Sequence, residues 1–144
     1  MAAITTVITG ATSGIGKVTA LELAKKGHAI YMLVRNTAKG EQVKKEIISA
    51  SSNKNIYVVE CDTADLQSIR NAAAELNSKL FAINILINNA GTIMRKPAAE
   101  HPDEYWDTVM AINLDAPFIL ALEIGKQMIG RGSGKIIFTC SLLS

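Results

Sequence analysis

The sequence predicts an α/β fold in which one parallel sheet of five strands is covered by helices on both faces, giving three layers. Short apolar runs alternate with longer segments whose apolar residues recur at helical spacing, and this alternation repeats until a last apolar run. The connections between these segments are short, which favours parallel strands joined by helices. The winding of such sheets reverses once, and we expect the strand order 3-2-1-4-5.

The first half of the chain contains three predicted strands. An apolar run at 6–9 has the length of one strand, and a helix over 14–26 ends at Gly27, a residue type common just past helix ends. The run from Ala29 to Val34 is apolar at nearly every position, as in a strand covered on both faces. The remaining elements of this half are a helix over 37–50 with a lysine-rich outer side and a strand over 56–59.

The second half continues the alternation. Asp65 is placed to cap a helix that runs to about Lys79. Three further elements complete the fold: a strand over 83–87, a long helix over 103–129 and a strand over 135–139. We expect the long helix to be interrupted around Asn113 and Pro117, because proline lacks the N–H that would bond the carbonyl four residues earlier.

Length and composition indicate one globular domain over residues 1–144. Hydrophobic residues make up 49% and charged residues 19% of the chain. The formal net charge is only +2 and the basic residues are scattered, so we expect no nucleic-acid partner. No uninterrupted apolar run reaches the roughly 18 residues that span a membrane, and we expect no membrane partner. Cys61 and Cys140 have no metal-ligand spacing, and we expect buried free thiols in a cytoplasmic protein. We also expect His28 and His101 at the surface.

Residues 9–16 join the first strand to the first helix and read T-G-A-T-S-G-I-G. The first glycine allows a tight turn, the second lets backbone N–H groups approach a pyrophosphate, and the third lets the helix pack closely on the strand. The helix N-terminus then offers unpaired N–H groups and a partial positive charge to an anion. Such glycine patterns also occur in ordinary turns. The candidate cofactor-binding residues here are Gly10, Thr12, Ser13, Gly14, Ile15 and Gly16.

Other candidate residues follow the remaining strands. Arg35 follows the second strand, Asp62 the third, Asn88 to Gly91 the fourth, and Ser141 the fifth. The carboxyl ends of parallel strands meet at one edge of the sheet, where ligands bind in such folds. This shared location favours a dinucleotide site over an ordinary glycine-rich turn.

With these motifs the sequence resembles the short-chain dehydrogenase/reductase family along its whole length, which implies a Rossmann-like fold. The turn at residues 9–16 looks like the family's cofactor turn, and Asp62 like its acid near the adenine. The segment Asn-Asn-Ala-Gly, with Asn88, Ala90 and Gly91 as candidate binding residues, is similar to the tetrapeptide that lines the adenosine side. Asn113 matches the asparagine of the catalytic tetrad, which helps to hold a proton-relay water, and Ser141 matches the catalytic serine.

Each of these residues also has a simpler interpretation. Asn88 and its neighbour could merely cap a turn. Asn113 could be a solvent-facing helix residue, although asparagine is unfavourable inside a helix. Ser141 could be an ordinary loop serine.

The end of the second strand indicates the cofactor. Family members that prefer NAD carry an acid there, which bonds the ribose 2′-OH. By register this position is Val34, and the next residue is Arg35. Arginine suits a 2′-phosphate because its planar fork donates two hydrogen bonds. We therefore predict NADP(H), with NAD as the alternative.

The resemblance also implies a tyrosine with a lysine four residues later, about a dozen residues past the serine, as the acid/base pair. The three tyrosines are followed at that spacing by Arg35, Cys61 and Val109. We therefore expect a binding fragment that lacks the groups for hydride transfer. Residues up to about 80 resemble reductases with an arginine after strand two, and residues 88–144 resemble sugar-acid dehydrogenases. A truncated, chimeric or engineered chain fits this pattern.

Truncation after the fifth strand has a physical consequence. Strand 135–139 would expose one edge, and exposed edges pair with other chains. The long helix 103–129 carries more apolar residues than a solvent-facing helix tolerates. We expect self-association through the helix, the strand edge or both. Two other functions stay open: a complete NADP-dependent sugar-acid or alcohol dehydrogenase present here as a shortened chain, and a scaffold without a ligand.

Overall fold

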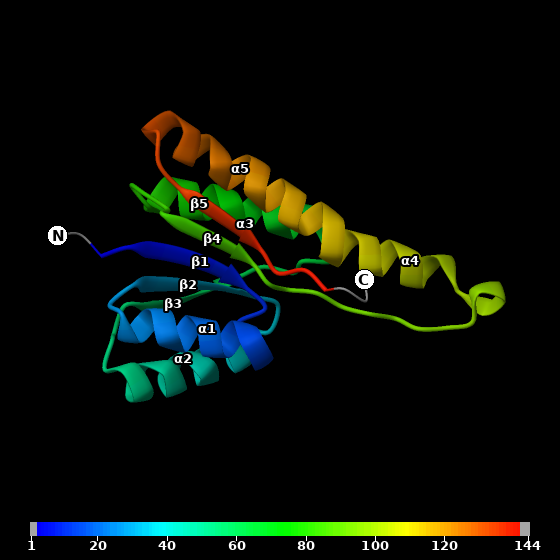
Figure 1. The fold of residues 1–144 in the computed structure, drawn as a ribbon, viewed down its shortest axis with the longest axis horizontal. Coiled ribbons are helices and arrows are strands. Elements are labelled where there is room, and N and C mark those ends of the chain that lie inside the picture. The colour runs from blue at the N-terminus through cyan, green and yellow to red at the C-terminus, as the bar shows by residue number, and fades with distance from the viewer. Residues whose placement is uncertain (1–2, 142–144) are drawn as a thin grey trace.

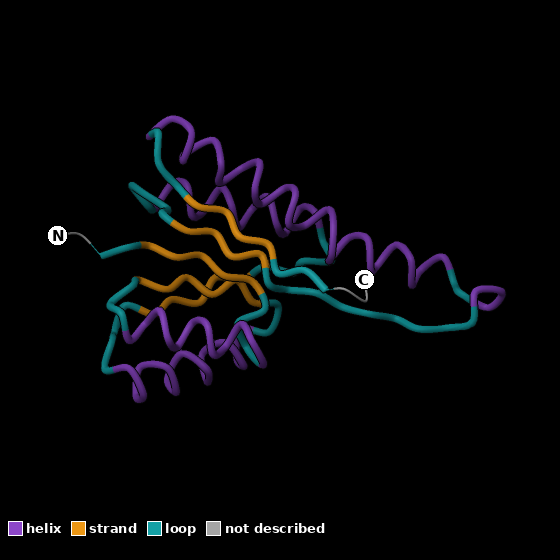
Figure 2. The backbone as a smooth tube through the Cα atoms, viewed as in Figure 1, coloured by secondary structure: helices purple, strands orange, loops and turns teal. Residues whose placement is uncertain are grey.

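The computed structural model describes residues 3–141 and contains the predicted five-stranded parallel sheet (Figures 1 and 2). The strand order is β3-β2-β1-β4-β5, as predicted. All four strand pairs are parallel. The strands are β1 (Thr5–Thr9), β2 (Ala29–Val34), β3 (Ile56–Glu60), β4 (Ile85–Asn88) and β5 (Lys135–Phe138).

The helices form two layers, one on each face of the sheet. The helices are α1 (Gly14–Lys25), α2 (Thr37–Ser51), α3 (Leu66–Lys79), η1 (Ala98–Glu100), α4 (Asp103–Met110), the π-helical turn η2 (Ala111–Asp115) and α5 (Ala116–Arg131). Figure 1 shows α1 and α2 together on one side and α3 and α5 on the other. The two layers bury separate apolar clusters. One contains Ile8, Ala20, Met32 and Ile47 beneath α1 and α2, and the other contains Val7, Ile69, Leu86 and Leu120 beneath α3 and α5.

Local signals in the sequence explain where these helices begin and end. The Asp65 carboxylate accepts hydrogen bonds from the backbone N–H groups of Gln67 (2.8 Å) and Ser68 (3.3 Å), so the predicted cap of α3 is confirmed. Gly27, just past α1, has a φ of +84°, a left-handed conformation that glycine adopts without strain.

Several element boundaries differ from the predictions by one to two residues. Strand β4 begins at Ile85, not at residue 83, because the Ile83 N–H donates to the Gln127 side chain (2.6 Å) instead of a neighbouring strand. Helix α5 runs past residue 129 to Arg131, where Gly132 ends it in a left-handed conformation. Strand β5 ends at Phe138, so the predicted range 135–139 is one residue too long.

Two predictions about burial were wrong. His28 is buried, and its Nδ1 lies 3.0 Å from the Thr6 hydroxyl, because residue 28 directly precedes β2 and packs against β1. Cys140 is exposed, because it lies beyond the end of β5. Cys61 is buried and free, as predicted.

The interruption of the long helix is confirmed. Between α4 and α5 the backbone forms the π-helical turn η2, which contains Asn113 and lies just before Pro117. By length and composition alone, the helical stretch Asp103–Arg131 is apolar enough to cross a membrane, although no uninterrupted apolar run indicated this. Core helices of soluble proteins satisfy the same criterion, and α5 packs its inner side into the core.

Candidate functional site

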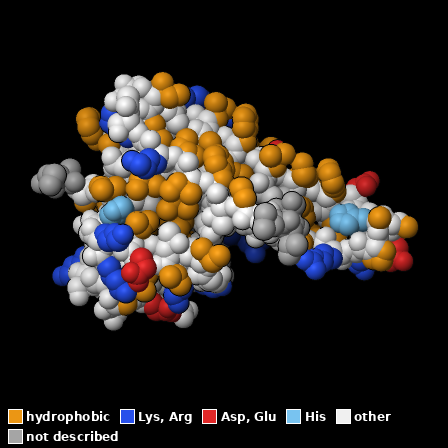
Figure 3. All heavy atoms as spheres, in the orientation of Figure 1, with side chains coloured by type: hydrophobic (Ala, Val, Ile, Leu, Met, Phe, Trp, Pro, Cys, Tyr) orange, Lys and Arg blue, Asp and Glu red, His pale blue; other side chains and the backbone are white. Residues whose placement is uncertain are grey.

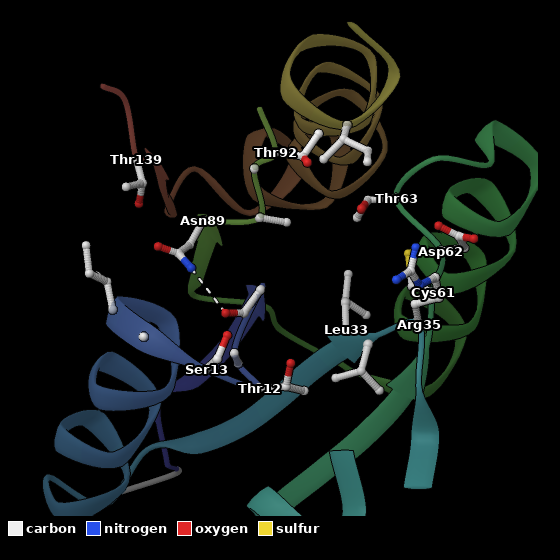
Figure 4. Close-up of a pocket in the computed structure, with 18 residues that line it drawn as sticks. Thr12, Ser13, Leu33, Arg35, Cys61, Asp62, Thr63, Asn89, Thr92 and Thr139 are labelled. Carbon is white, nitrogen blue, oxygen red and sulfur yellow. Dashed lines mark hydrogen bonds between the residues drawn. The ribbon is translucent and has the colours of Figure 1, made fainter. Parts of the chain in front are cut away.

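A large open pocket lies at the carboxyl edge of the sheet, where the candidate residues were expected to meet (Figure 4). It has a volume of about 670 Å³. The candidate residues that line it are Gly10, Thr12, Ser13, Gly14, Ile15, Arg35, Asp62, Ala90 and Gly91. Its other lining residues include Leu33, Cys61, Thr63, Asn89, Thr92, Ile112 and Thr139. Four candidates lie outside this lining: Gly16, Asn88, Asn113 and Ser141.

The turn between β1 and α1 requires glycine for two physical reasons. Gly10 and Gly14 have φ values of +66° and +52°, a left-handed conformation that other residues adopt only with strain. Gly16 needs space instead, because a Cβ there would lie 2.2 Å from the Gly10 carbonyl oxygen. Open space surrounds the position of a Cβ on Gly14. The turn thus fixes its own backbone and leaves the approach to the start of α1 open.

No side chain of the N-cap or first turn of α1 neutralises the N-terminus of this helix. Ser13 occupies the N-cap position without a side-chain capping bond, and the first turn contains no acidic residue. The first N–H groups of this helix therefore retain their hydrogen-bonding capacity and their partial positive charge, and Gly14 and Ile15 line the pocket. This arrangement is suited to an anion.

A hydroxyl that we did not single out joins the glycine turn to the end of β4. The Thr9 Oγ1 accepts hydrogen bonds from the backbone N–H groups of Asn89 (3.0 Å) and Ala90 (2.9 Å). The Asn89 side chain donates to the Gly10 carbonyl at 3.3 Å, the bond drawn in Figure 4. The available signal was a buried threonine at the end of an apolar strand. These three bonds hold two walls of the pocket together.

Arg35, which follows β2, lines another part of the pocket together with Cys61 and Asp62 of the β3–α3 connection, and Figure 4 labels all three on the same side of it. Arg35 is exposed and forms no ion pair with the described residues. The Asp62 carboxylate accepts from the Ala64 N–H (2.9 Å), and the Asp62 N–H donates to the Ser68 hydroxyl (2.9 Å). These bonds fix the loop after β3.

The Cys61 thiol is unreactive in this environment. Burial, with smaller contributions from Asp62 and Asp65, raises the pKa of its thiol to about 11. The thiol is therefore protonated at neutral pH and is not a nucleophile. Within residues 3–141, no group of three or more His, Cys, Asp and Glu side chains is placed to hold a metal ion.

Asn113 joins the π-helical turn to the loop after β4. Its Oδ1 accepts from the Thr92 N–H and its Nδ2 donates to the Thr92 carbonyl, both at 2.9 Å. The side chain is exposed, yet it is bonded to another segment, so Asn113 is more than a solvent-facing helix residue. Ser141, the other predicted catalytic residue, lies three positions past the end of β5 and is exposed.

Comparison with known proteins gives one consistent family. The sequence model of short chain dehydrogenases matches residues 4–144. A 2-dehydro-3-deoxy-D-gluconate 5-dehydrogenase of Pseudoalteromonas atlantica is 45% identical over 138 residues, covering 95% of this chain and 54% of that protein. An NAD-dependent glycerol dehydrogenase of Listeria innocua is 33% identical over 141 residues, covering 96% and 52%.

A solved structure agrees with these sequence matches. The gluconate 5-dehydrogenase of Burkholderia cenocepacia J2315, in complex with NADP and tartrate, has a TM-score of 0.86 at 33% identity, covering 98% of this chain and 55% of that one. The chain spans about half the length of the relatives that it matches.

Proposed function

Because the chain belongs to the short chain dehydrogenase family, we propose that its pocket binds a nicotinamide dinucleotide, NADP(H) in preference to NAD(H). The observation that carries this proposal is the N-terminus of α1. Gly14 leaves the approach to it open, its first turn contains no acidic residue, and it faces a pocket of about 670 Å³. The pyrophosphate would lie against Gly14 and Ile15, with the hydroxyls of Thr12 and Ser13 as further donors.

The adenosine half of the cofactor would lie over the ends of β2 and β3. Asp62 would line the adenine side, and Ala90 and Gly91 would form the opposite wall, with Asn88 behind it. Arg35 would bind the 2′-phosphate, since its guanidinium is exposed at the pocket and pairs with none of the described acids. Val34 offers no acceptor for a 2′-OH. The solved relative with bound NADP supports this choice, whereas the NAD-dependent glycerol dehydrogenase represents the alternative.

The chain would act as a binding module, and residues 1–144 would form one domain. Asn113 and Ser141 would be the catalytic residues that it supplies, the first through its backbone carbonyl because its side chain is bonded to Thr92. The sequence contains no Tyr-x-x-x-Lys to transfer a proton during hydride transfer. We therefore expect binding without turnover by the 144-residue chain, and a cytoplasmic location.

A second candidate function is that of a sugar-acid dehydrogenase, as in two of the relatives. Two of them are named for sugar acids, a dehydro-deoxygluconate dehydrogenase and a gluconate dehydrogenase. In this case a longer protein would oxidise or reduce a sugar acid with NADP(H), and residues 3–141 would be its cofactor half. Reading the gene past Ser144 for Tyr-x-x-x-Lys separates the two candidates.

We also propose that the chain self-associates. The outer side of the long helix exposes large apolar residues, and β5 pairs on only one edge with the strands of residues 3–141. Figure 3 shows hydrophobic side chains gathered along this upper part of the molecule. The exposed apolar residues are Trp106, Leu114, Phe118, Leu122 and Ile129 on the helix and Ile137 and Phe138 on the strand. Light scattering that shows a monomer at high protein concentration would contradict this.

Calorimetric titration with NADPH tests the binding proposal. We expect saturable binding with a dissociation constant on the order of micromolar to millimolar. Gly14→Val should abolish it, because valine resists a φ of +52° and places a side chain before the first N–H groups.

The matched control is Gly27→Val, which imposes a left-handed conformation on valine at the opposite end of α1, also in open space. This variant should bind NADPH normally if it folds. An absence of binding by the unsubstituted chain at millimolar NADPH would favour a scaffold without a ligand.

A further inference from the structure

The side chain of Asn88 lies buried behind the pocket, without a hydrogen-bond partner in the described part of the chain. Asn88 is the last residue of β4 and is 5% exposed, and neither its Nδ2 nor its Oδ1 has a hydrogen-bond partner among the described residues. Its backbone is fixed in the sheet, because its carbonyl accepts from the Thr139 N–H at 2.9 Å. A buried amide that is left unpaired is costly, so a native fold normally supplies it with a partner.

A small cavity adjoins this amide on the α5 side of the sheet. It has a volume of about 10 Å³, close to the lower limit for holding one water molecule. Asn88 lines it together with Ile112 and Pro117 from the long helix. Thr63, Ala90 and Ile112 line both this cavity and the large pocket, so the cavity lies directly behind the pocket wall.

The π-helical turn leaves the carbonyl of Ile112, a residue that lines this cavity, without its helical donors. The carbonyl of Ile112 would pair with the N–H of residue 116 in an α-helix or of residue 117 in a π-helix. The Ala116 N–H is already bonded to the Ala111 carbonyl, and residue 117 is a proline, which has no N–H. The cavity is therefore lined by Asn88, whose side-chain amide can both donate and accept, and by Ile112, whose backbone carbonyl lacks its helical donors.

We propose that this cavity holds one buried water molecule, which accepts a hydrogen bond from Asn88 Nδ2 and donates one to the Ile112 carbonyl. The water joins the end of β4 to the π-helical turn and so fixes the turn that presents Asn113 to Thr92. Asn88 is then a positioning residue that lies behind the cofactor pocket and touches no ligand. This inference concerns the folded chain alone and does not depend on the proposed function.

Nuclear magnetic resonance on the unsubstituted chain tests the water directly. The Asn88 side-chain NH₂ protons should show cross-peaks to water with the sign of a long-lived, buried molecule. A crystal structure should show one ordered water within about 3.2 Å of both Asn88 Nδ2 and the Ile112 carbonyl. An empty cavity, or an Asn88 amide bonded only to protein atoms, would overturn the proposal.

A variant tests the positioning role. In Asn88→Leu, which is similar in volume and apolar, the water should be lost. The backbone N–H of Ala116, which closes the turn, should then exchange with solvent a few-fold to about tenfold faster. The N–H of Ile69, bonded to the Asp65 carbonyl in α3, should be unaffected.

The control is Asn71→Leu, on the exposed side of α3, which should change neither the water nor the Ala116 exchange. Unchanged Ala116 exchange in a folded Asn88→Leu variant would contradict the positioning role. If that variant does not fold, the measurements on the unsubstituted chain still decide whether the water exists.

Discussion

Asn113 and Thr92 form a reciprocal pair, in which the asparagine side chain both accepts from the Thr92 N–H and donates to the Thr92 carbonyl at 2.9 Å. This pair joins the π-helical turn to the loop that leaves β4. The side-chain amide of Asn113, a predicted catalytic residue, is thus occupied by structural hydrogen bonds. Any role of Asn113 in proton transfer would therefore belong to its backbone carbonyl. After β4 this loop runs on to α4 (Figure 1).

The first prediction concerns this pair. Asn113→Ala removes both bonds and should destabilise the chain by about 1–2 kcal/mol, at about 1 kcal/mol or less for each exposed bond. Urea unfolding measures the change, and hydrogen exchange should show the Thr92 N–H losing protection. Asn113→Asp keeps an acceptor for that N–H but turns an acceptor toward the Thr92 carbonyl, so it should recover only part of the loss. Unchanged Thr92 exchange in both variants would contradict the role of the pair.

The second prediction compares the effects on stability of replacing Gly16 and Gly130 by alanine. Gly16→Ala would place a Cβ 2.2 Å from the Gly10 carbonyl oxygen, a backbone atom that cannot move without deforming the turn. We expect a loss of about 1–3 kcal/mol in the free energy of unfolding. The control is Gly130→Ala, in α5 with open space around it, which should stabilise the chain by up to about 1 kcal/mol. Equal effects of the two substitutions would show that the turn is not packed as described.

The third prediction concerns pH. Burial, and to a smaller degree the charge of Lys26, lowers the pKa of His28. The folded state then binds a proton at His28 less readily than the unfolded state does. At a pH well above the ordinary histidine pKa of about 6.5, His28 is neutral in both states and does not reduce the free energy of unfolding. As the pH falls from about 6.5 toward the lowered pKa, the unfolded state takes up the proton first, and the free energy of unfolding decreases. Urea unfolding should therefore show stability decreasing from pH 7.5 to pH 5.5.

The matched variants identify the responsible group. His28→Gln should flatten the decrease, whereas His101→Gln, on the loop before α4, should retain it. A decrease that persists unchanged in His28→Gln would assign it to other groups.

The fourth prediction concerns cofactor choice. Arg35→Asp should reverse the preference for NADPH over NADH, changing the ratio of the two affinities by about tenfold or more. We expect the lower end of this range, because exposed charges are screened by solvent. Arg95→Asp is the control, since Arg95 is also exposed but does not line the pocket. A ratio that stays the same in Arg35→Asp would show that Arg35 does not contact the 2′-phosphate.

Much of the fold could be predicted because each signal acted locally. The parallel pairing of the strands follows from short connections between apolar runs, the cap of α3 from Asp65, and the interruption of the long helix from Pro117. The burial of His28 could not be predicted in this way. It depends on Thr6, which is 22 residues earlier and lies on the neighbouring strand.

The candidate site shows the same limit. The residues at the pocket were found because the carboxyl ends of parallel strands share one edge of the sheet. The hydrogen bond from the Ala90 N–H to the Thr9 hydroxyl joins residues 81 positions apart, and the bond from the Thr92 N–H to Asn113 joins residues 21 positions apart. No periodicity in the sequence encodes such contacts. The orientation of Asn88 toward α5, away from the pocket, likewise depends on which face of β4 it occupies.

The proposed function depends above all on the open N-terminus of α1 binding the pyrophosphate of a dinucleotide. The most direct test is to follow the backbone amide resonances of the chain during a titration with NADPH. We predict saturable shifts that are largest at Ser13, Gly14, Ile15 and Gly16, with a second group around Arg35. Shifts that are absent at millimolar NADPH, or that fall elsewhere and leave residues 13–16 unchanged, would contradict pyrophosphate binding at this helix.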